Sequence, residues 1–259
     1  FRKSLEALRL EGKIVTADRN KQVPAAFAAD VHETVPGVTD ISYIPSLLEI
    51  CKRHRIHLLV PLIDTELQIL AEHRQEFEKL GVAVLVSSPE ANQICYDKRK
   101  TADFLESIHM KTPKILNPGQ ILSDPHACFP VMLKPFNGSG SKGAVKINGH
   151  EELKFFLQYI PDPIVQEYIS GREFTVDVLV DFQGTARAAV PRWRMETRAG
   201  EISRGMTVKD KKIMAAAKKV AEALPGAVGC ITLQCFETEE NEIVFIEINH
   251  RFGGGIPLS

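Results

Sequence analysis

Hydrophobic and polar residues in the first third of the chain alternate between the spacing of a helix and that of a buried strand. The pattern predicts helices at 1–12, 41–56 and 65–81 and strands at 13–18, 57–64 and 82–88. Alternating helices and apolar strands are typical of a parallel sheet that is covered by helices. We therefore expect an α/β layer up to about residue 90, completed by one more strand before Phe1.

The pattern changes after this layer. Residues 88–109 have helical spacing, with Pro89 near the start of the predicted helix and a break around 111–113. Short strands joined mostly by turns follow, at 129–135, 143–147, 163–169, 173–181, 185–193, 229–237 and 242–249. Helices are predicted only at 150–160 and 209–224. The second part is therefore expected to be an α+β domain rich in antiparallel strands, with the boundary between 90 and 112.

Composition and charge narrow the range of partners. The 259 residues are 44% hydrophobic and 25% charged, which is enough for two compact units. Thirty-two Lys and Arg balance 33 Asp and Glu, so no overall field attracts nucleic acid or an anionic membrane. No apolar run approaches the roughly 20 residues that span a bilayer. We expect neither a nucleic-acid partner nor a membrane partner, and any anion must be bound locally.

The five cysteines are an odd number and form no C-x-x-C pair. This usage predicts reduced thiols and a location in the cytoplasm. Cys230 and Cys235 lie on one predicted strand at an odd separation, so their side chains should point to opposite faces and share no metal.

Residues 133–147, LKPFNGSGSKGAVKI, contain a G-x-G-x-x-G pattern at Gly138, Gly140 and Gly143. In a dinucleotide fold this pattern joins a strand to a helix, whereas here AVKI reads as a second strand. The glycines are therefore expected in a hairpin between two strands. Such a hairpin covers a triphosphate in some folds, with Lys134 as the nearby cation, and it forms a plain mobile turn in others. The loop alone leaves both readings open.

Two later stretches carry oxygen ligands in strand spacing. After a break at 170–171, Glu173 begins a strand in which acidic and polar residues occupy alternate positions. In IVFIEIN the apolar residues, Ile246 among them, alternate with Glu247 and Asn249. The turn before this strand predicts a hairpin in which Gln234 falls opposite Glu247, within a residue or two. Three oxygen-bearing side chains on one face suit Mg²⁺, although a polar outer face of the sheet is the alternative.

The ordered set of these motifs resembles the ATP-grasp superfamily. It comprises Asp97-Lys98, Lys134, the 138–143 loop, QEYISGREFTVD and FIEINHRFGGG. The chain is similar to single-module ligases of the carbamoyl-phosphate-synthetase type, and more distantly to biotin carboxylase and the ligases of pyrrolysine biosynthesis. The resemblance covers essentially the whole chain. It implies a Rossmann-like preATP-grasp domain, followed by a domain in which two antiparallel sheets clasp ATP.

The resemblance also implies domain bounds. The Rossmann-like domain is expected at 1–90, a connecting helix at 91–112, a lid subdomain at 113–168 and a core subdomain at 169–259. The sequence ends in a glycine loop that reads as unfinished, so further core residues are expected beyond it.

The resemblance assigns roles to individual residues. The nucleotide-binding set is Lys98, Lys134, the loop residues Gly138, Ser139, Gly140, Ser141 and Gly143, the adenine hinge Glu167, Tyr168 and Ile169, and the ribose acid Glu173. The metal set is Gln234, Glu247 and Asn249, for Mg²⁺ or Mn²⁺, and Arg251 matches the catalytic arginine beside the γ-phosphate. Gln234 departs from the acid that many relatives have, and His250 stands where proline is common.

The implied reaction is phosphorylation of a carboxylate by ATP, followed by attack of an amine on the acyl phosphate. It needs no Ser/His/Asp or Cys/His set, and none is evident. A basic stretch is the candidate substrate region, with Arg192 and Arg194 foremost; a solvated basic strand is the alternative. This stretch contains Arg187, Arg192, Arg194, Arg198 and Arg204.

Two other functions stay open at this stage. One is a nucleotide-binding regulatory module without turnover, and the other is an NAD-dependent oxidoreductase, which the hairpin position of the glycines disfavours. For the ligase, the expected partners are small-molecule carboxylate and amine substrates, and a homodimer is compatible with the resemblance.

Overall fold

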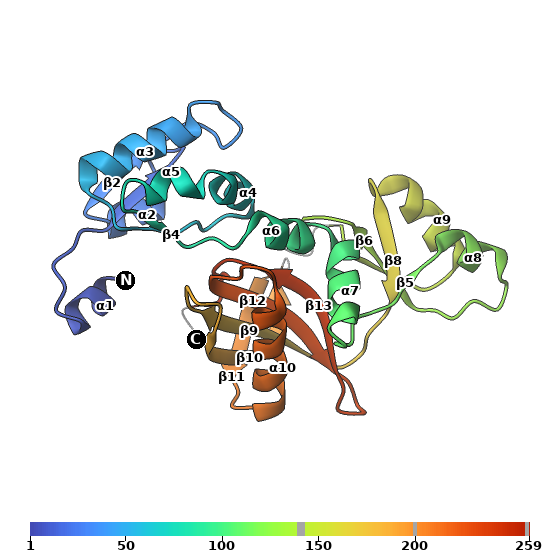
Figure 1. Ribbon diagram of the computed structural model, residues 1–259. Coiled ribbons are helices and arrows are strands. Elements are labelled where there is room, and N and C mark those ends of the chain that lie inside the picture. Colours follow the sequence, from blue (N-terminus) through green and yellow to red (C-terminus); the bar gives the residue numbers. More distant parts are fainter. Residues whose placement is uncertain (139–142, 199–200, 257–258) are drawn as a thin grey trace. The chain divides into compact units, whose positions relative to one another are not determined.

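The computed structural model describes residues 1–138, 143–198, 201–256 and 259, apart from the side chain of Glu201 (Figure 1). The chain divides into two compact units, Phe1–Leu85 and Val86–Ser259. No helix among the described residues has the length and apolar character that crossing a membrane requires.

The first unit contains short elements of both kinds. They are α1 (Arg2–Ala7), β1 (Val15–Asp18), α2 (Pro24–Ala28), β2 (Val31–Thr34), α3 (Tyr43–His54), β3 (Leu58–Leu59), α4 (Asp64–Glu72), α5 (Arg74–Glu78) and β4 (Ala83–Val84). β1 pairs with β2 and β3 pairs with β4, both in parallel. The predicted parallel strands are confirmed, although β2 was not predicted and the helix predicted at 65–81 is two helices that meet at His73.

The longest helix of this unit shows why the periodic pattern was readable. α3 buries Tyr43, Ile44, Leu47, Ile50 and Cys51, which recur at helical spacing on one face. Arg55 then adopts a left-handed conformation with φ of 51°, which ends the helix.

The second unit begins with two helices and continues with two sheets. The elements are α6 (Pro89–Tyr96), α7 (Lys98–Ser107), β5 (Ile115–Leu116), α8 (Pro118–Ser123), β6 (Val131–Pro135), β7 (Val145–Ile147), α9 (His150–Tyr159), β8 (Pro163–Glu167), β9 (Arg172–Val180), β10 (Ala186–Arg198), β11 (Glu201–Thr207), α10 (Lys211–Ala223), β12 (Gly229–Glu237) and β13 (Ile243–Asn249). The sequence did not predict β5, α8 or β11.

The single helix predicted at 88–109 is divided at Asp97. The backbone of Asp97 is extended, and its carboxylate accepts a hydrogen bond from the Arg99 N–H at 2.9 Å. Asp97 is therefore the N-cap of a new helix, which begins at Lys98. Because of this cap, Lys98 lies at a helix start, and its backbone N–H donates to Phe136 O at 2.8 Å.

Both sheets of the second unit are antiparallel throughout. The smaller sheet has the strand order β5-β8-β6-β7, and the larger has the order β11-β10-β9-β12-β13. The α+β class predicted for this part of the chain is confirmed.

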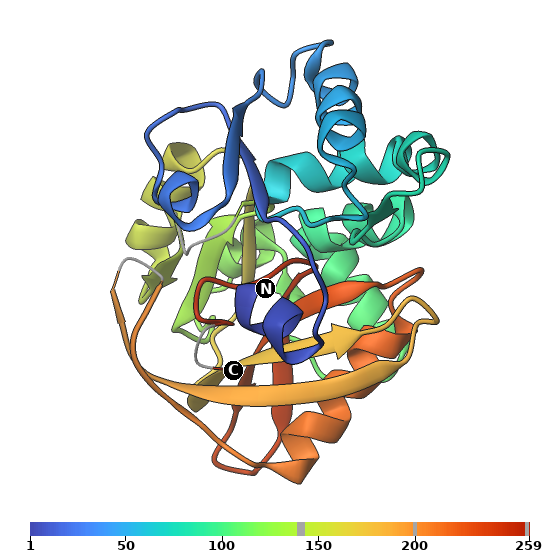
Figure 2. The same ribbon diagram turned by 90° about the vertical axis from the view of Figure 1, so that its left-hand side faces the viewer.

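Each sheet has one face packed against helices. Val131, Leu133 and Val165 of the smaller sheet form a core with Leu153 of α9. In the larger sheet, Phe174, Val176 and Val178 of β9 pack with α10 and with residues of α6 and α7. Figures 1 and 2 show α10 along one side of this sheet. The alternate residues of β9 consequently face the other side, where polar residues gather.

The predicted orientation of Cys230 and Cys235 to opposite faces of this sheet is confirmed. Cys235 is part of the apolar core beside α10, whereas the Cys230 thiol lies on the opposite face, 3.8 Å from Thr232 Oγ1.

Candidate functional site

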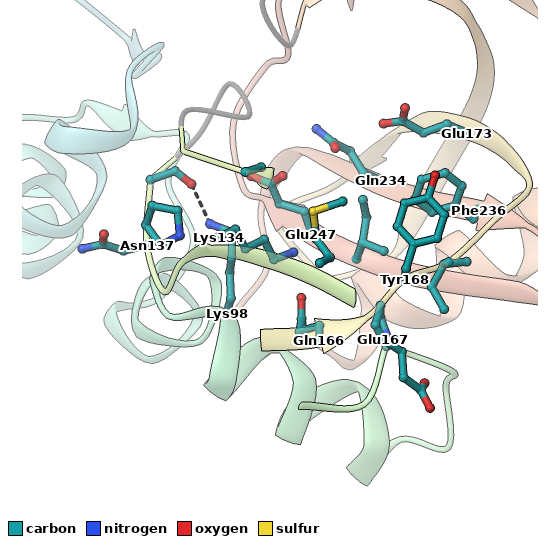
Figure 3. Close-up of a pocket in the computed structure, with 17 residues that line it drawn as sticks. Lys98, Lys134, Asn137, Gln166, Glu167, Tyr168, Glu173, Gln234, Phe236 and Glu247 are labelled. Atoms are coloured by element: carbon teal, nitrogen blue, oxygen red, sulfur yellow. Dashed lines mark hydrogen bonds between the residues drawn. The ribbon is translucent and has the colours of Figure 1, made fainter. Parts of the chain in front are cut away.

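A cavity of about 360 Å³ lies within the second unit and is lined by residues of both sheets (Figure 3). It brings together residues that the sequence analysis singled out far apart in the chain. Those that line it are Lys98, Lys134, Gly138, Glu167, Tyr168, Ile169, Glu173, Gln234 and Glu247. The predicted convergence of these stretches is therefore present in the fold.

Lys134 lies on β6 with its cross-strand partner Ile164 on β8. Neighbouring residues Leu133 and Pro135 flank it, and Leu133 points to the opposite face, into the core under α9. Burial lowers the pKa of the Lys134 ammonium to about 8, an effect that Glu247 opposes and Lys98 reinforces. Lys134 thus places a partly desolvated cation in the cavity, where an anionic group would be attracted strongly.

Lys98 holds the chain that follows β6. Its Nζ donates to Gly138 O at 2.7 Å, and its backbone N–H donates to Phe136 O. Gly138 and Gly143 both have positive φ, at 91° and 74°. β6 and β7 pair in antiparallel fashion on either side of the glycine segment. The glycines therefore join two strands, as predicted, and not a strand to a helix; Ser139, Gly140 and Ser141 lie outside the described residues.

Gln234 and Glu247 are cross-strand partners on β12 and β13, as the sequence predicted. Both line the cavity, and Figure 3 shows their side chains on the same side of the sheet. The pairing jumps from Gln234–Glu247 to Cys235–Phe245, so Ile246 is an extra residue and forms a β-bulge. The expected strict alternation is wrong at Ile246, which lines the cavity beside Glu247 because the bulge turns it to that face.

Asn249 and Arg251 lie farther along the same segment. Asn249 pairs with Thr232, and neither Asn249 nor Arg251 is among the described residues that line the cavity. The Arg251 backbone carbonyl accepts a hydrogen bond from Thr232 Oγ1 at 3.0 Å, and Arg251 Nη1 donates to Phe252 O at 3.0 Å. Of the three predicted metal ligands, the cavity therefore brings Gln234 and Glu247 together.

Glu173 reaches the cavity from the start of β9. Its Oε1 lies 2.9 Å from Arg194 Nε, and Arg194 Nη1 also donates to Thr175 Oγ1 at 3.2 Å. Burial raises the pKa of the Glu173 carboxyl; Arg194 opposes that rise, and Glu247 adds to it.

Arg192, the other arginine singled out on β10, is buried in an ion pair. Its Nε lies 2.8 Å from Asp177 Oδ2, and both side chains are less than 5% exposed. Asp177 also accepts hydrogen bonds from Thr232 and Ser259. The more distant arginines pair locally at the surface, Arg187 with Asp181 and Arg198 with Glu196.

Part of the cavity lining is apolar. It comprises Met132, Ile169, Phe236 and Ile246. The Glu167 carboxylate turns away in Figure 3, and its Oε2 accepts from the Lys114 N–H at 3.1 Å. Only the backbone of Glu167 is therefore directed to the cavity. Lys146 Nζ lies 4.4 Å from the centre of the Tyr168 ring, which holds that ring against β7.

Sequence reasoning missed Gln166, which lines the same cavity and is only 3% exposed. The signal was present in PIVQEYI. A glutamine at the centre of an apolar strand, two residues after Ile164, must face the same side as Ile164 and hence the same side as Lys134.

Two models of known protein families match this chain. A family model described as an ATP-grasp domain matches residues 95–255, and a model described as a PylC-like N-terminal domain matches residues 1–85. The chain belongs to the ATP-grasp family. The resemblance stated from the sequence is thereby confirmed, together with the predicted combination of an α/β domain and an ATP-grasp domain.

The relatives that match this chain include differently named enzymes. The chain is 28% identical over 179 residues to a D-alanine–D-alanine ligase of Fusobacterium nucleatum, a match that covers 66% of this chain and 61% of the relative. It is 26% identical to a carbamoyl-phosphate synthase of Methanobrevibacter smithii, over 80% of this chain and 60% of the relative. It is 25% identical to a formate-dependent phosphoribosylglycinamide formyltransferase of Bacteroides fragilis, over 95% of this chain and 66% of the relative. The chain thus spans about three fifths to two thirds of these relatives.

Solved structures share the fold. The biotin carboxylase of Campylobacter jejuni, crystallised as a complex with β,γ-ATP, superposes with a TM-score of 0.72 at 18% identity, covering 99% of this chain and 63% of that one. The L-amino acid ligase of Bacillus licheniformis superposes with a TM-score of 0.73 at 17% identity, and the match covers 99% of this chain and 64% of that one.

Proposed function

We propose that this ATP-grasp chain is part of an ATP- and Mg²⁺-dependent ligase that activates a carboxylate for attack by an amine. The observation that carries the proposal is the cavity itself. Two lysines, a carboxylate–amide pair and several apolar side chains line one continuous site. A nucleoside triphosphate has a matching set of groups: phosphates with metal, a ribose and a flat base.

The donor set fits a magnesium ion. Glu247 supplies one carboxylate and its partner Gln234 an amide oxygen, with Asn249 two residues farther along β13. Mg²⁺ prefers hard oxygen ligands, keeps several waters and is commonly held by one or two carboxylates together with substrate phosphates. When bound, the ion would neutralise the charge of the transferred phosphoryl group.

Nucleotide placement follows from the described side chains. Lys134 and Lys98 would bind phosphate oxygens, Glu173 would accept the ribose hydroxyls, and the backbone of Glu167 to Ile169 would meet the base. Arg251 would lie near the γ-phosphate. Arg194 holds Glu173 by its ion pair and so positions the proposed ribose acceptor.

The reaction balances without a protein nucleophile. A substrate carboxylate oxygen attacks the γ-phosphorus, the bond to the β-phosphate oxygen breaks, and ADP leaves. The amine nitrogen then attacks the acyl carbon, inorganic phosphate leaves, and the amine loses a proton. The protein contributes positioning and charge compensation, which is what the cavity residues offer.

Thermal shift in the full chain tests nucleotide binding. ATP with Mg²⁺ should raise the unfolding temperature more than ATP with EDTA, and NAD should have no effect. The hairpin position of the glycines is the reason to expect no response to NAD. Stabilisation by NAD alone would overturn the proposal in favour of an oxidoreductase.

Whether the site catalyses the reaction needs a test separate from nucleotide binding, because only one of the three proposed metal ligands, Glu247, is a carboxylate. Pools of carboxylates and amines should provoke ADP release, and hydroxylamine should trap the acyl phosphate as a hydroxamate. ATP binding without ADP release across broad pools would instead support a regulatory nucleotide-binding module.

A homodimer and a cytoplasmic location complete the proposal. A 2-oxoglutarate carboxylase domain of the same fold was solved as a dimer, which supports the first. Sedimentation velocity of the full chain checks the homodimer, and fractionation of the source cells checks the cytoplasmic location.

A further inference from the structure

The segment that follows β13 lies directly on the polar face of the larger sheet. A Cβ added at Gly253 would lie 3.2 Å from Thr232 Oγ1 and 3.6 Å from Asp177 Oδ1. A Cβ added at Gly255 would overlap Arg192 Nη1. Glycine at these two positions therefore lets the backbone approach three polar side chains, which come from β12, β9 and β10.

These three side chains form one buried cluster. Arg192, Asp177 and Thr232 are each less than 5% exposed. Arg192 Nε lies 2.8 Å from Asp177 Oδ2, and Thr232 Oγ1 lies 3.0 Å from Asp177 Oδ1. A buried charge or hydroxyl that loses its partner costs free energy, so each member of the cluster is held in place by the others.

Thr232 joins this cluster to the backbone at Arg251. Its Oγ1 lies 3.0 Å from Arg251 O as well as from Asp177 Oδ1, so the two acceptors share the single hydroxyl hydrogen. Farther along the segment, Ser259 Oγ donates to Asp177 Oδ2 at 2.6 Å. The segment is thus attached to the cluster at Arg251 and again at Ser259.

The cluster is separate from the cavity of the second unit. None of Asp177, Arg192 and Thr232 is among the described residues that line it. Arg251 is the residue that relates the cluster to the proposed reaction, because its backbone carbonyl is held by Thr232. The reach of a long arginine side chain depends on where its backbone is fixed, and a displacement of about 1 Å is enough to impair catalysis.

We infer that Thr232, supported by the Asp177–Arg192 pair, is a positioning residue that fixes the backbone at Arg251 so that its guanidinium meets the γ-phosphoryl group of ATP. The inference rests on the proposed function, which places Arg251 near this group. It goes further by giving the buried cluster a task in phosphoryl transfer without contact to nucleotide or substrate. It also removes Arg192 from the candidates for substrate binding.

Beryllium fluoride is the probe, because with bound ADP it mimics the γ-phosphoryl group and requires no knowledge of the carboxylate or the amine. The affinity of the full chain for ADP with Mg²⁺ is measured first by calorimetry. The affinity of the ADP-loaded protein for beryllium fluoride is measured next. Arg251→Met should lower the second affinity by at least about tenfold, since a charged hydrogen bond is lost, and leave the affinity for ADP close to that of wild type.

Thr232→Val tests the positioning role, because it deletes the hydroxyl and keeps the shape of the side chain. It should lower the affinity for beryllium fluoride by about three- to tenfold and leave that for ADP close to wild type. Thr232→Ser, which keeps the hydroxyl, should restore the affinity for beryllium fluoride. Thr185→Val makes the same change at an exposed turn between β9 and β10 and is the matched control. A merely structural role for Thr232 would leave the affinity for beryllium fluoride unchanged relative to that for ADP.

Gly255→Ala is the second variant, should Thr232→Val fail to fold. The added Cβ would overlap Arg192 Nη1 and displace the segment while Thr232 is intact, so the same selective loss of beryllium fluoride affinity is expected. Gly149→Ala is its control, because nothing lies within 4 Å of the added atom.

Three results would overturn the inference and leave the nucleotide site in place. They are wild-type affinity for beryllium fluoride in Thr232→Val and Gly255→Ala, wild-type affinity in Arg251→Met, and no binding of beryllium fluoride by ADP-loaded wild type. Failure of Thr232→Ser to restore the affinity would equally contradict the role of the hydroxyl. If wild type does not bind ADP with Mg²⁺, the proposed function itself is refuted, and this inference with it.

Discussion

Arg194 and Glu173 form an ion pair across neighbouring strands, with Arg194 Nε 2.9 Å from Glu173 Oε1. The Arg194 side chain is 7% exposed and that of Glu173 is 27% exposed. The pair lies at the margin of the cavity, since Glu173 lines it. An arginine first considered for substrate binding is therefore committed to a carboxylate of the proposed nucleotide site.

Removing Arg194 should weaken nucleotide binding in a pH-dependent way. Burial already raises the pKa of the Glu173 carboxyl, and Arg194 opposes that rise. In Arg194→Met the pKa rises further, so the carboxylate is protonated as the pH falls through that raised value, and affinity for an ATP analogue falls with it. Calorimetry across the pH range checks this, because loss of structure alone would weaken binding equally at all pH values.

The same variant should lower the free energy of unfolding by about 1–3 kcal/mol, less than a fully buried pair because Glu173 keeps contact with solvent. Arg198→Met is the control, since Arg198 is paired with Glu196 on the same strand but is 79% exposed. It should cost less than about 0.5 kcal/mol in urea titrations. Equal losses in the two variants would contradict a special role for Arg194.

Lys134→Met should stabilise the nucleotide-free protein while weakening ATP binding. The Lys134 ammonium has a pKa of about 8 in the folded state, below its ordinary value of 10.5, because burial disfavours the charged form. The charge therefore destabilises the fold below pH 8, and that penalty is relieved as the pH rises from about 8 to 10.5, where the unfolded chain binds more protons. Deleting the charge should raise the unfolding temperature at pH 7 by about 2–4 °C for each kcal/mol recovered.

Wild-type affinity for ATP should also decline as the pH rises through about 8, because Lys134 then loses its charge. Lys146→Met, on the neighbouring strand β7, is the control, and its pH profile should match that of wild type. A flat profile in wild type would contradict the placement of phosphates at Lys134.

Glu247→Gln should lower Mn²⁺ affinity, measured with a non-hydrolysable ATP analogue present, by at least about tenfold. It deletes the only formal charge among Gln234, Glu247 and Asn249 while keeping the size of the side chain. Gln234→Glu should do the reverse, because the added carboxylate lies directly across from Glu247. If neither substitution changes the affinity, the β12–β13 hairpin does not bind the metal.

Gly171→Ala should destabilise the second unit by about 2 kcal/mol or more. An added Cβ would lie 2.2 Å from Glu237 O, and the φ of Gly171 is 155°. Gly184→Ala is the matched control, because its φ is 79° but nothing lies within 4 Å of the added atom. It should cost only the backbone strain, about 1 kcal/mol, so urea titrations of the two variants isolate the effect of the collision.

Much of this architecture could be predicted from the sequence, because the periodicity of apolar residues shows which face of a helix or strand is buried. The spacing of Tyr43, Leu47 and Ile50 predicted α3, and the residues around Lys134 predicted a strand followed by a hairpin. Gln234 and Glu247 were correctly placed opposite each other, because a short turn fixes the register of the hairpin. The ordered motifs were sufficient to recognise the ATP-grasp family.

The errors arose where a local pattern competes with a specific contact. The helix predicted at 88–109 stops at Asp97, because that carboxylate caps the next helix. β11 was missed, since its residues gain strand structure by pairing with β10. The extra residue Ile246 was assigned to the wrong face, because a bulge shifts the register between β12 and β13.

The sequence by itself determined the longer elements, the two-part organisation and the hairpin that carries Gln234 and Glu247. Only the tertiary structure decided that Arg194 is paired with Glu173, that Glu167 turns away from the cavity and that Gln166 lines it. The physical reason is the distance along the chain between the interacting residues. Periodicity follows from the geometry of neighbouring residues, whereas the partner of a buried polar group is set by strands that are distant in the chain and adjacent in the sheet.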